Sequence, residues 1–213
     1  MTKAEIYGRA AALLLGYLPG CILTGAIVAK VFTGKSASEI GRSGNPGMAN
    51  IMANVGFKAG ILTLAGDLVK CIAAALLGHL LLRSRIGGAA VLYAVTGCIL
   101  GHDFPFWRRF HGGKGVASGC IGFVLIEPLA GAAAVILGML TVFATQYLCV
   151  GACVIPAAFA LLLAWQKQWE AAAVALFLAA VSVIKNPDIW LIRRGECPKT
   201  DVPGALRKKF KKK

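Results

Sequence analysis

Long apolar runs constrain this chain more than any other feature of its sequence. They follow one another along most of the 213 residues, and most are about 15 to 25 residues long, which is the length that a helix needs to cross a bilayer. Hydrophobic residues make up 58% of the chain and charged residues 15%, whereas a soluble domain is close to half apolar and a quarter charged. A transmembrane barrel would show short alternating segments instead. We therefore expect an all-α membrane protein.

The apolar runs predict a bundle of seven transmembrane helices. They lie near residues 5–32, 59–82, 87–101, 115–126, 128–147, 149–165 and 169–184. The fifth and sixth runs nearly touch, so six spans are the alternative. The first run continues past Pro19 and no convincing cleavage site follows it, which favours a retained transmembrane helix over a signal peptide.

The distribution of Lys and Arg predicts the orientation of the bundle. Two polar loops, with the edge residue Lys58, hold six of these residues, and the tail from Lys185 holds ten. The opposite ends of the spans hold five. Because cytoplasmic ends carry the excess of positive charge, we expect the N-terminus outside and the C-terminus in the cytoplasm. We expect one membrane domain, residues 1–195, and a basic cytoplasmic tail, residues 196–213, that lies against anionic lipid headgroups and not nucleic acid.

The first polar loop contains the sequence SGNPG at residues 43–47, followed by the helical pattern MANIMANVG. Glycines allow backbone amides to converge on an anion without obstruction by side chains, and a helix N-terminus adds unpaired N–H groups. The loop is therefore a candidate phosphate site. An ordinary turn between two spans is the alternative.

The second polar loop, GHDFPFWRRFHGGKGVASG at residues 101–119, is richer in positive charge. Its residues Gly112, Gly113, Lys114 and Gly115 precede a further helical run, and Arg108, Arg109 and His111 lie just upstream. It does not match the nucleotide-binding P-loop, because Arg108 stands where that motif needs its first glycine. With both loops on one predicted face, the sequence indicates a site for two anionic groups at the cytoplasmic surface, beside lipid tails, and hence for a phosphorylated, lipid-linked substrate.

The apolar runs also contain an aspartate, a lysine and most of the cysteines. Asp67 and Lys70 are three residues apart in one predicted span, where charged residues are functional candidates by default, and a self-neutralising ion pair is the alternative. The seven cysteines include no C-x-x-C pair and are expected to be buried thiols. We expect no metal and no cofactor.

The two loops resemble the signatures of the bacterial acyl-phosphate:glycerol-3-phosphate acyltransferase family, the PlsY family. The stretches are GRSGNPGMANIMANVGFKAGILTLAGDLVK and GHDFPFWRRFHGGKGVASG, and the resemblance extends over nearly the whole chain. It implies an acyltransferase of the bacterial cell membrane with seven helices and an active site facing the cytoplasm. Its substrates would be acyl phosphate and glycerol 3-phosphate, acylated at the 1-hydroxyl, and its products lysophosphatidic acid and phosphate, as in phospholipid biosynthesis.

The resemblance also implies which residues form the site. Ser43 and Lys114 would be catalytic, and contacts to the phosphates or the glycerol backbone would come from Gly44, Asn45, Gly47, Asn50, Gly112, Gly113, Gly115, Ser118, Lys185 and Asp188.

The chain departs from the family pattern at four places. Met48 and Ala49 replace Ala-Thr, Ala53 stands where the family often has arginine, Lys185 replaces a histidine and Asp188 an asparagine. Three hypotheses follow: an acyltransferase with rearranged anion contacts, a paralogue with a different acyl acceptor, or a non-catalytic membrane protein that binds lipid or phosphate.

Overall fold

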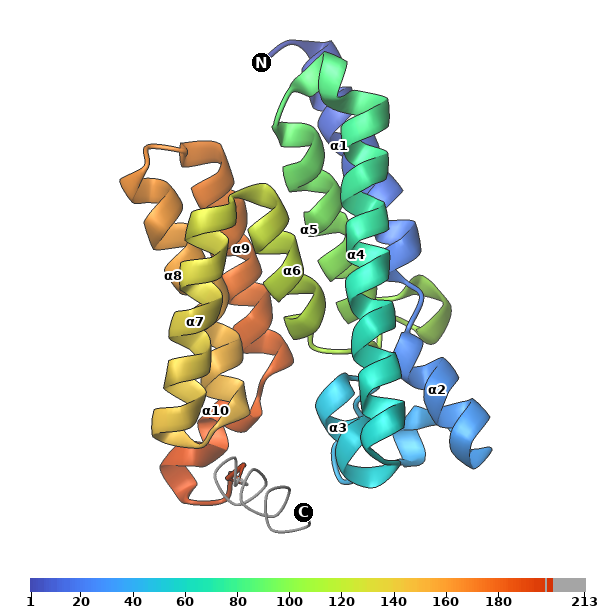
Figure 1. Ribbon diagram of the computed structural model, residues 1–213. Helices are drawn as coiled ribbons and strands as arrows, with labels where there is room; N and C mark the ends of the chain where they lie inside the picture. Colours follow the sequence, from blue (N-terminus) through green and yellow to red (C-terminus); the bar gives the residue numbers. More distant parts are fainter. Residues whose placement is uncertain (198, 201–213) are drawn as a thin grey trace. The chain divides into compact units, whose positions relative to one another are not determined.

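The computed structural model describes residues 1–197, 199 and 200, and this part of the chain is helical, without strands (Figure 1). The α-helices are α1 (Lys3–Gly20), α2 (Thr24–Thr33), α3 (Met48–Asn54), α4 (Phe57–Ile86), α5 (Ala89–Asp103), α6 (Val116–Ile126), α7 (Pro128–Thr145), α8 (Leu148–Trp165), α9 (Trp169–Lys185) and α10 (Asp188–Leu191). Three 3-10 turns are η1 (Ala37–Glu39), η2 (Phe106–Arg108) and η3 (Ile192–Arg194).

Within the described residues, five segments are long and apolar enough to cross a membrane. They are Lys3–Thr33, Phe57–Ile86, Ala89–Arg108, Pro128–Thr145 and Leu148–Trp165. A sixth would be Trp169–Lys185 together with Asp188–Arg194, which are bent by 60° at their junction. Each of the seven predicted runs contains a helix, but α6 has 11 residues, fewer than the roughly 20 that span a bilayer. The count of seven spans therefore stays a prediction.

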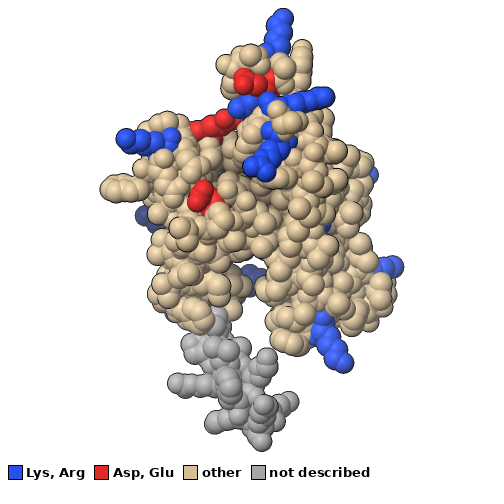
Figure 2. Space-filling model, turned by 45° about the horizontal axis from the view of Figure 1, so that its top comes forward, with Lys and Arg blue, Asp and Glu red and all other residues tan. Residues whose placement is uncertain are grey.

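The surface agrees with a membrane environment. Large apolar side chains are widely exposed, among them Leu80 at 75%, Leu129 at 82% and Trp165 at 88%, and most of the face seen in Figure 2 carries no Lys, Arg, Asp or Glu. Exposed apolar surface on this scale fits contact with lipid tails and not with water. The prediction of an all-helical, multi-pass membrane protein is confirmed.

The described residues form two compact units, one over Met1–Gly131 and one that begins at Ala132. The first unit is built on close contact between α1 and α5. A Cβ added at any of four glycines would overlap the backbone of the other helix, at Gly16, Gly20, Gly97 and Gly101. Small residues at such spacing let two helices approach backbone to backbone in a membrane. The contact holds the C-terminal end of α5 beside the end of α1.

Helix α1 ends at a break of three residues before α2 begins. Pro19 lies in the last turn of α1, and Cys21 and Leu23 on either side of Ile22 are buried. Such an interruption of the helix leaves backbone carbonyls that no helical amide satisfies. The carbonyl oxygens of Cys21 and Ile22 instead accept hydrogen bonds from the side chains of Trp107 and Lys70.

In the second unit, α8 packs against α9. The hydroxyl of Ser182 donates to the carbonyl of Ala152 across this contact. The predicted separation of the fifth and sixth runs is confirmed, because Gln146 and Tyr147 lie between α7 and α8 and Gln146 has a left-handed backbone, with φ of 62°. Of the predicted basic tail, residues 198 and 201–213 lie outside the described residues.

Candidate anion-binding site

The backbone of the second loop is fixed by the C-terminal end of α5. The amide of Gly112 donates to the carbonyl oxygen of Asp103 (3.1 Å), and the amide of Gly113 donates to the carbonyl oxygen of His102 (2.9 Å). These carbonyls lie in the last turn of α5, where no later helical amide reaches them. The loop amides therefore provide donors for the last carbonyls of α5, and these hydrogen bonds fix the path of the loop.

The glycines of this loop are required by how closely it approaches α5. A Cβ on Gly112 would overlap the carbonyl oxygen of His102, and a Cβ on Gly113 would overlap Nε2 of the His102 ring. Gly115 has a left-handed backbone with φ of 62°, and a Cβ there would lie 2.8 Å from Oδ1 of Asp103. The sequence suggested that these glycines leave space for an anion. The structure shows that their missing side chains also leave space for His102 and Asp103.

Helix α6 begins directly after the loop, with Gly115 as its N-cap. The half-buried Lys114 directly precedes the N-cap of α6 in the sequence. The positive charge of this lysine therefore adds to the partial positive charge of the first amides of the helix. Ser118 lies in this first turn but is fully buried, and its hydroxyl donates to the carbonyl of Asp67 on α4 at 3.4 Å. Ser118 therefore faces the protein interior in this structure.

The first loop is closed by its own asparagines. The amide of Gly47 donates to Oδ1 of Asn45 (2.9 Å), a local turn that asparagine favours. The side-chain amide of Asn50 donates to the carbonyls of Ile40 and Asn45, both at 2.9 Å. Both N–H groups of Asn50 are thus used to close the loop.

The remaining predicted residues of the first loop have different surroundings. Ser43 is exposed, and its hydroxyl accepts a long hydrogen bond of 3.4 Å from the amide of Asn45. Gly44 has a left-handed backbone, with φ of 57°, and Gly47 is the N-cap of the seven-residue helix α3. Ser43 therefore presents an exposed hydroxyl on this loop.

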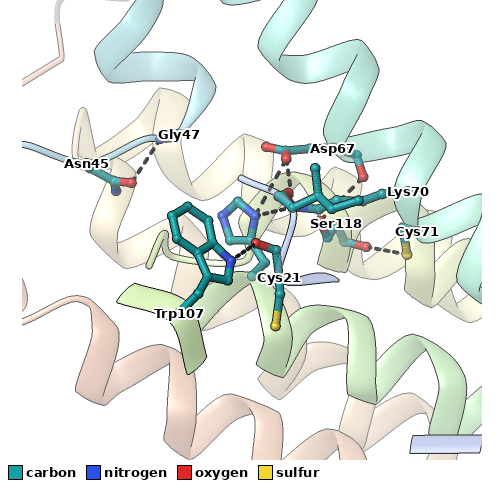
Figure 3. A network of polar contacts seen from close by, with 10 residues as sticks. Cys21, Asn45, Gly47, Asp67, Lys70, Cys71, Trp107 and Ser118 are labelled. Atoms are coloured by element: carbon teal, nitrogen blue, oxygen red, sulfur yellow. Dashed lines mark hydrogen bonds and ion pairs between the residues drawn. The ribbon is translucent and has the colours of Figure 1, made fainter. Parts of the chain in front are cut away.

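The structure attaches both loops to the segment around the break between α1 and α2. Gly25, in the first turn of α2, packs against the carbonyl of Pro46 in the first loop. From the second loop, the indole N–H of Trp107 donates to the carbonyl of Cys21 (2.8 Å). Figure 3 shows the turn at Asn45 and Gly47 in one view with Trp107 and the polar groups of α4.

Asp67, Lys70 and His102 form a buried cluster in this region. Figure 3 shows Asp67 and Lys70 close together. Nζ of Lys70 is 2.9 Å from Oδ1 of Asp67, 2.7 Å from Nδ1 of His102 and 2.9 Å from the carbonyl oxygen of Ile22. Nδ1 of His102 is 3.5 Å from Oδ1 of Asp67. The ion pair between Asp67 and Lys70 that the sequence suggested is present, but it is part of a larger cluster.

Sequence reasoning missed His102, Asp103 and Trp107 as parts of this site. The signal was available, because His102 and Asp103 end a predicted span shortly before the glycines. What the sequence does not reveal is that the chain turns back, so that the glycines contact these two residues.

Lys185 and Asp188 lie in the second unit. Lys185 is the last residue of α9 and Asp188 the first of α10. Between them, the side chain of Asn186 is buried and donates to the carbonyl of Ser182 (2.9 Å). The structure describes their local surroundings, and their predicted contact with a phosphate stays a prediction.

These observations define a class: a multi-pass helical membrane protein with two glycine-rich loops fixed beside a buried ion pair, one of them leading into a helix start next to a lysine. A family model described as glycerol-3-phosphate acyltransferase matches residues 10–190. The chain belongs to the glycerol-3-phosphate acyltransferase family, and it is an acyltransferase by this membership.

Individual relatives match over nearly the full length. The chain is 36% identical to "Glycerol-3-phosphate acyltransferase 1" of Lactobacillus acidophilus, covering 97% of both chains. It is 34% identical to "Glycerol-3-phosphate acyltransferase 1" of Lactobacillus johnsonii, covering 93% of this chain and 95% of the relative. Its fold is similar to a crystal structure of PlsY, an integral membrane glycerol 3-phosphate acyltransferase in its glycerol 3-phosphate form, with a TM-score of 0.79 and 20% identity over 93% of this chain and 98% of that one.

Proposed function

We propose that the chain transfers a fatty acyl group from acyl phosphate to the 1-hydroxyl of glycerol 3-phosphate, giving lysophosphatidic acid and inorganic phosphate. The observation that carries this proposal is the second loop, where Lys114 precedes the start of α6 on a backbone fixed by α5. Membership of the family and the glycerol 3-phosphate form of the PlsY structure support the choice of acceptor.

The chemistry needs little more than positioning and charge. Acyl phosphate is a mixed anhydride, so phosphate is already a good leaving group. The 1-hydroxyl oxygen attacks the carbonyl carbon, and the bond between that carbon and the bridging oxygen of the phosphate breaks. The bonding pair leaves with the phosphate, which takes up the hydroxyl proton and departs as hydrogen phosphate. Holding the two substrates together and stabilising the charge that develops on the phosphate account for most of the acceleration such a site gives.

We assign one substrate to each loop. The second loop, with Lys114 and the amides at the start of α6, holds the phosphate of the acyl donor, and the ammonium group neutralises its developing charge. The first loop, through Ser43, Gly44, Asn45 and Gly47, holds glycerol 3-phosphate, with the exposed Ser43 hydroxyl next to the reacting groups. No metal or cofactor enters this scheme.

The proposed orientation follows from the charges. Seven spans, with α6 as the short one, put both loops and the basic tail on the cytoplasmic face of a bacterial cell membrane and the N-terminus outside. The orientation can be tested with Ser43→Cys and a thiol reagent that does not cross membranes. Labelling of this cysteine in inverted vesicles but not in intact cells would support the proposed orientation.

Removing the Lys114 side-chain charge tests the role of the second loop. We expect Lys114→Ala to abolish acyl phosphate turnover, or lower it by at least about 100-fold, because removal of one group that stabilises transition-state charge typically costs this much. The measurement is formation of lysophosphatidic acid in membranes that contain equal amounts of each variant. The matched control is Arg85→Ala, which removes a positive charge from the exposed C-terminal end of α4. Wild-type turnover by Lys114→Ala would contradict the assignment.

A second candidate function is favoured by the changed residues around the loops. Ala49 and Ala53 lack the hydroxyl and the positive charge of the family pattern, and Lys185 and Asp188 differ in charge from it. A different acyl acceptor would be indicated if acyl phosphate were consumed without acylation of glycerol 3-phosphate. Binding of acyl phosphate without turnover would indicate a lipid-binding protein.

A further inference from the structure

Protein groups from three elements surround the buried ammonium group of Lys70. It forms an ion pair of 2.9 Å with Oδ1 of Asp67 on α4, and it hydrogen-bonds the carbonyl of Ile22 in the α1–α2 break and Nδ1 of His102 on α5. Lys70 is 6% exposed. Buried among these groups, Lys70 is placed to act on its neighbours and not on a substrate.

The contacts also define the state of His102. With Lys70 charged in its ion pair with Asp67, its ammonium group can only donate, so Nδ1 of His102 is the acceptor in their contact and the neutral ring carries its proton on Nε2. The carboxylate of Asp67 balances the charge of Lys70, which makes the buried pair tolerable. Lys70 therefore fixes both the protonation pattern and the orientation of the imidazole ring.

The His102 ring supports the second loop from behind. Nε2 occupies the space that a side chain on Gly113 would need, and the carbonyl of the same histidine accepts the amide of Gly113. The neighbouring carbonyl of Asp103 accepts the amide of Gly112. A change in the position of His102 would thus be passed to two successive amides of the loop.

The same cluster is connected to both ends of the loop. Before it, Trp107 donates to the carbonyl of Cys21, which adjoins the Ile22 carbonyl held by Lys70. After it, Ser118 donates to the carbonyl of Asp67. The loop is therefore attached to the cluster before, within and after residues 112–115.

We propose that Asp67, Lys70 and His102 are positioning residues that set the backbone of residues 112–115, so that this loop can hold a phosphate. They do this from behind the loop, without touching the substrate. The inference rests on the proposed function for its catalytic consequence, but the effect on the loop backbone can be measured without any reaction.

The test is a variant that removes the cluster while sparing the fold. In Asp67→Leu/Lys70→Met both charges are replaced by apolar side chains, and such replacement of a buried ion pair is often neutral or stabilising. His102→Leu, which leaves the ion pair in place, is the second variant. Thr96→Val on α5 is the matched control, because Thr96 is equally buried and its hydroxyl bonds the carbonyl of Leu92 within its own helix.

The first measurement is hydrogen–deuterium exchange of the purified full chain in detergent. We expect the amides of Gly112 and Gly113, which donate to the carbonyls of Asp103 and His102, to exchange on the order of 10-fold faster in both cluster variants, because these carbonyls are no longer held in place, and to be unchanged in Thr96→Val. Exchange at the wild-type rate in a folded cluster variant would overturn the proposal, whether or not the protein proves to be an acyltransferase.

The second measurement separates positioning from general stability. In the folded variants we expect kcat/KM to fall by about 100-fold, the scale of a misplacement of about 1 Å, with a raised KM for acyl phosphate and an unchanged KM for glycerol 3-phosphate. A purely structural role would lower the amount of active protein and leave both KM values as they are, which would contradict the proposal. Faster exchange together with a wild-type protein that forms no lysophosphatidic acid would support the positioning role and refute the proposed function.

Discussion

Gly113 is the residue whose role the structure changes most. In sequence it was one of several glycines that leave room for an anion, and this remains an expectation. In the structure its missing side chain makes room for the His102 ring, and its amide is bonded to the carbonyl of the same residue. A single position therefore connects the buried cluster to the loop.

We expect Gly113→Ala to reduce both stability and activity. The added methyl group must displace the His102 ring, and inserting a methyl into a packed interior typically costs about 1–3 kcal/mol of unfolding free energy. We also expect a fall of about 100-fold in kcat/KM from the shifted loop. Thermal unfolding in detergent and turnover of acyl phosphate measure the two effects.

The control for this substitution is Gly88→Ala at the opposite end of α5. Gly88 has a helical backbone, with φ of −62°, and open space where a Cβ would lie, so alanine should be neutral or slightly stabilising there. Equal melting temperatures and turnover for the two alanine variants would show that the contact between Gly113 and His102 is unimportant.

At the scale of elements, the sequence predicted the helices better than the connections. Every apolar run became a helix because its length and composition leave few alternatives in a bilayer. The break at residues 21–23 was not predicted, since the run from 5 to 32 carries no charged residue between Arg9 and Lys30. Its purpose is visible only in the structure, where the freed carbonyls of Cys21 and Ile22 accept from Trp107 and Lys70.

The first loop and α3 form one such connection, and Asn50 closes it. Asn50→Asp keeps the shape of the side chain but removes the two N–H donors that bond the carbonyls of Ile40 and Asn45. Loss of these bonds, with two carbonyls facing a carboxylate, should lower the unfolding free energy by about 1–3 kcal/mol.

We also expect Asn50→Asp to raise KM for glycerol 3-phosphate more than KM for acyl phosphate, because this loop is assigned to the acceptor. Steady-state kinetics with each substrate varied in turn measures the difference. Asn54→Asp is the control, since Asn54 is exposed and its side-chain amide bonds Asn50 one turn earlier in α3. A larger rise for acyl phosphate would reverse the assignment of the loops.

At the scale of the whole molecule, the class of protein followed from composition and the family from two loops. The buried cluster could be predicted only in part: the spacing of Asp67 and Lys70 indicates a helical pair, but the contact with His102 joins residues 32 apart in sequence. Pairings of this kind depend on how α4 and α5 pack, and single-sequence patterns do not encode that packing. The chain also differs from the pattern of its family at Ala49, Ala53, Lys185 and Asp188.

We propose above all that this chain makes lysophosphatidic acid from acyl phosphate and glycerol 3-phosphate. The most direct measurement is to incubate the purified protein with acyl phosphate and glycerol 3-phosphate and to quantify lysophosphatidic acid and inorganic phosphate. We predict that the two products form in equal amounts and only when both substrates are present. Phosphate released without lysophosphatidic acid, or acyl phosphate bound without release of phosphate, would contradict the claim.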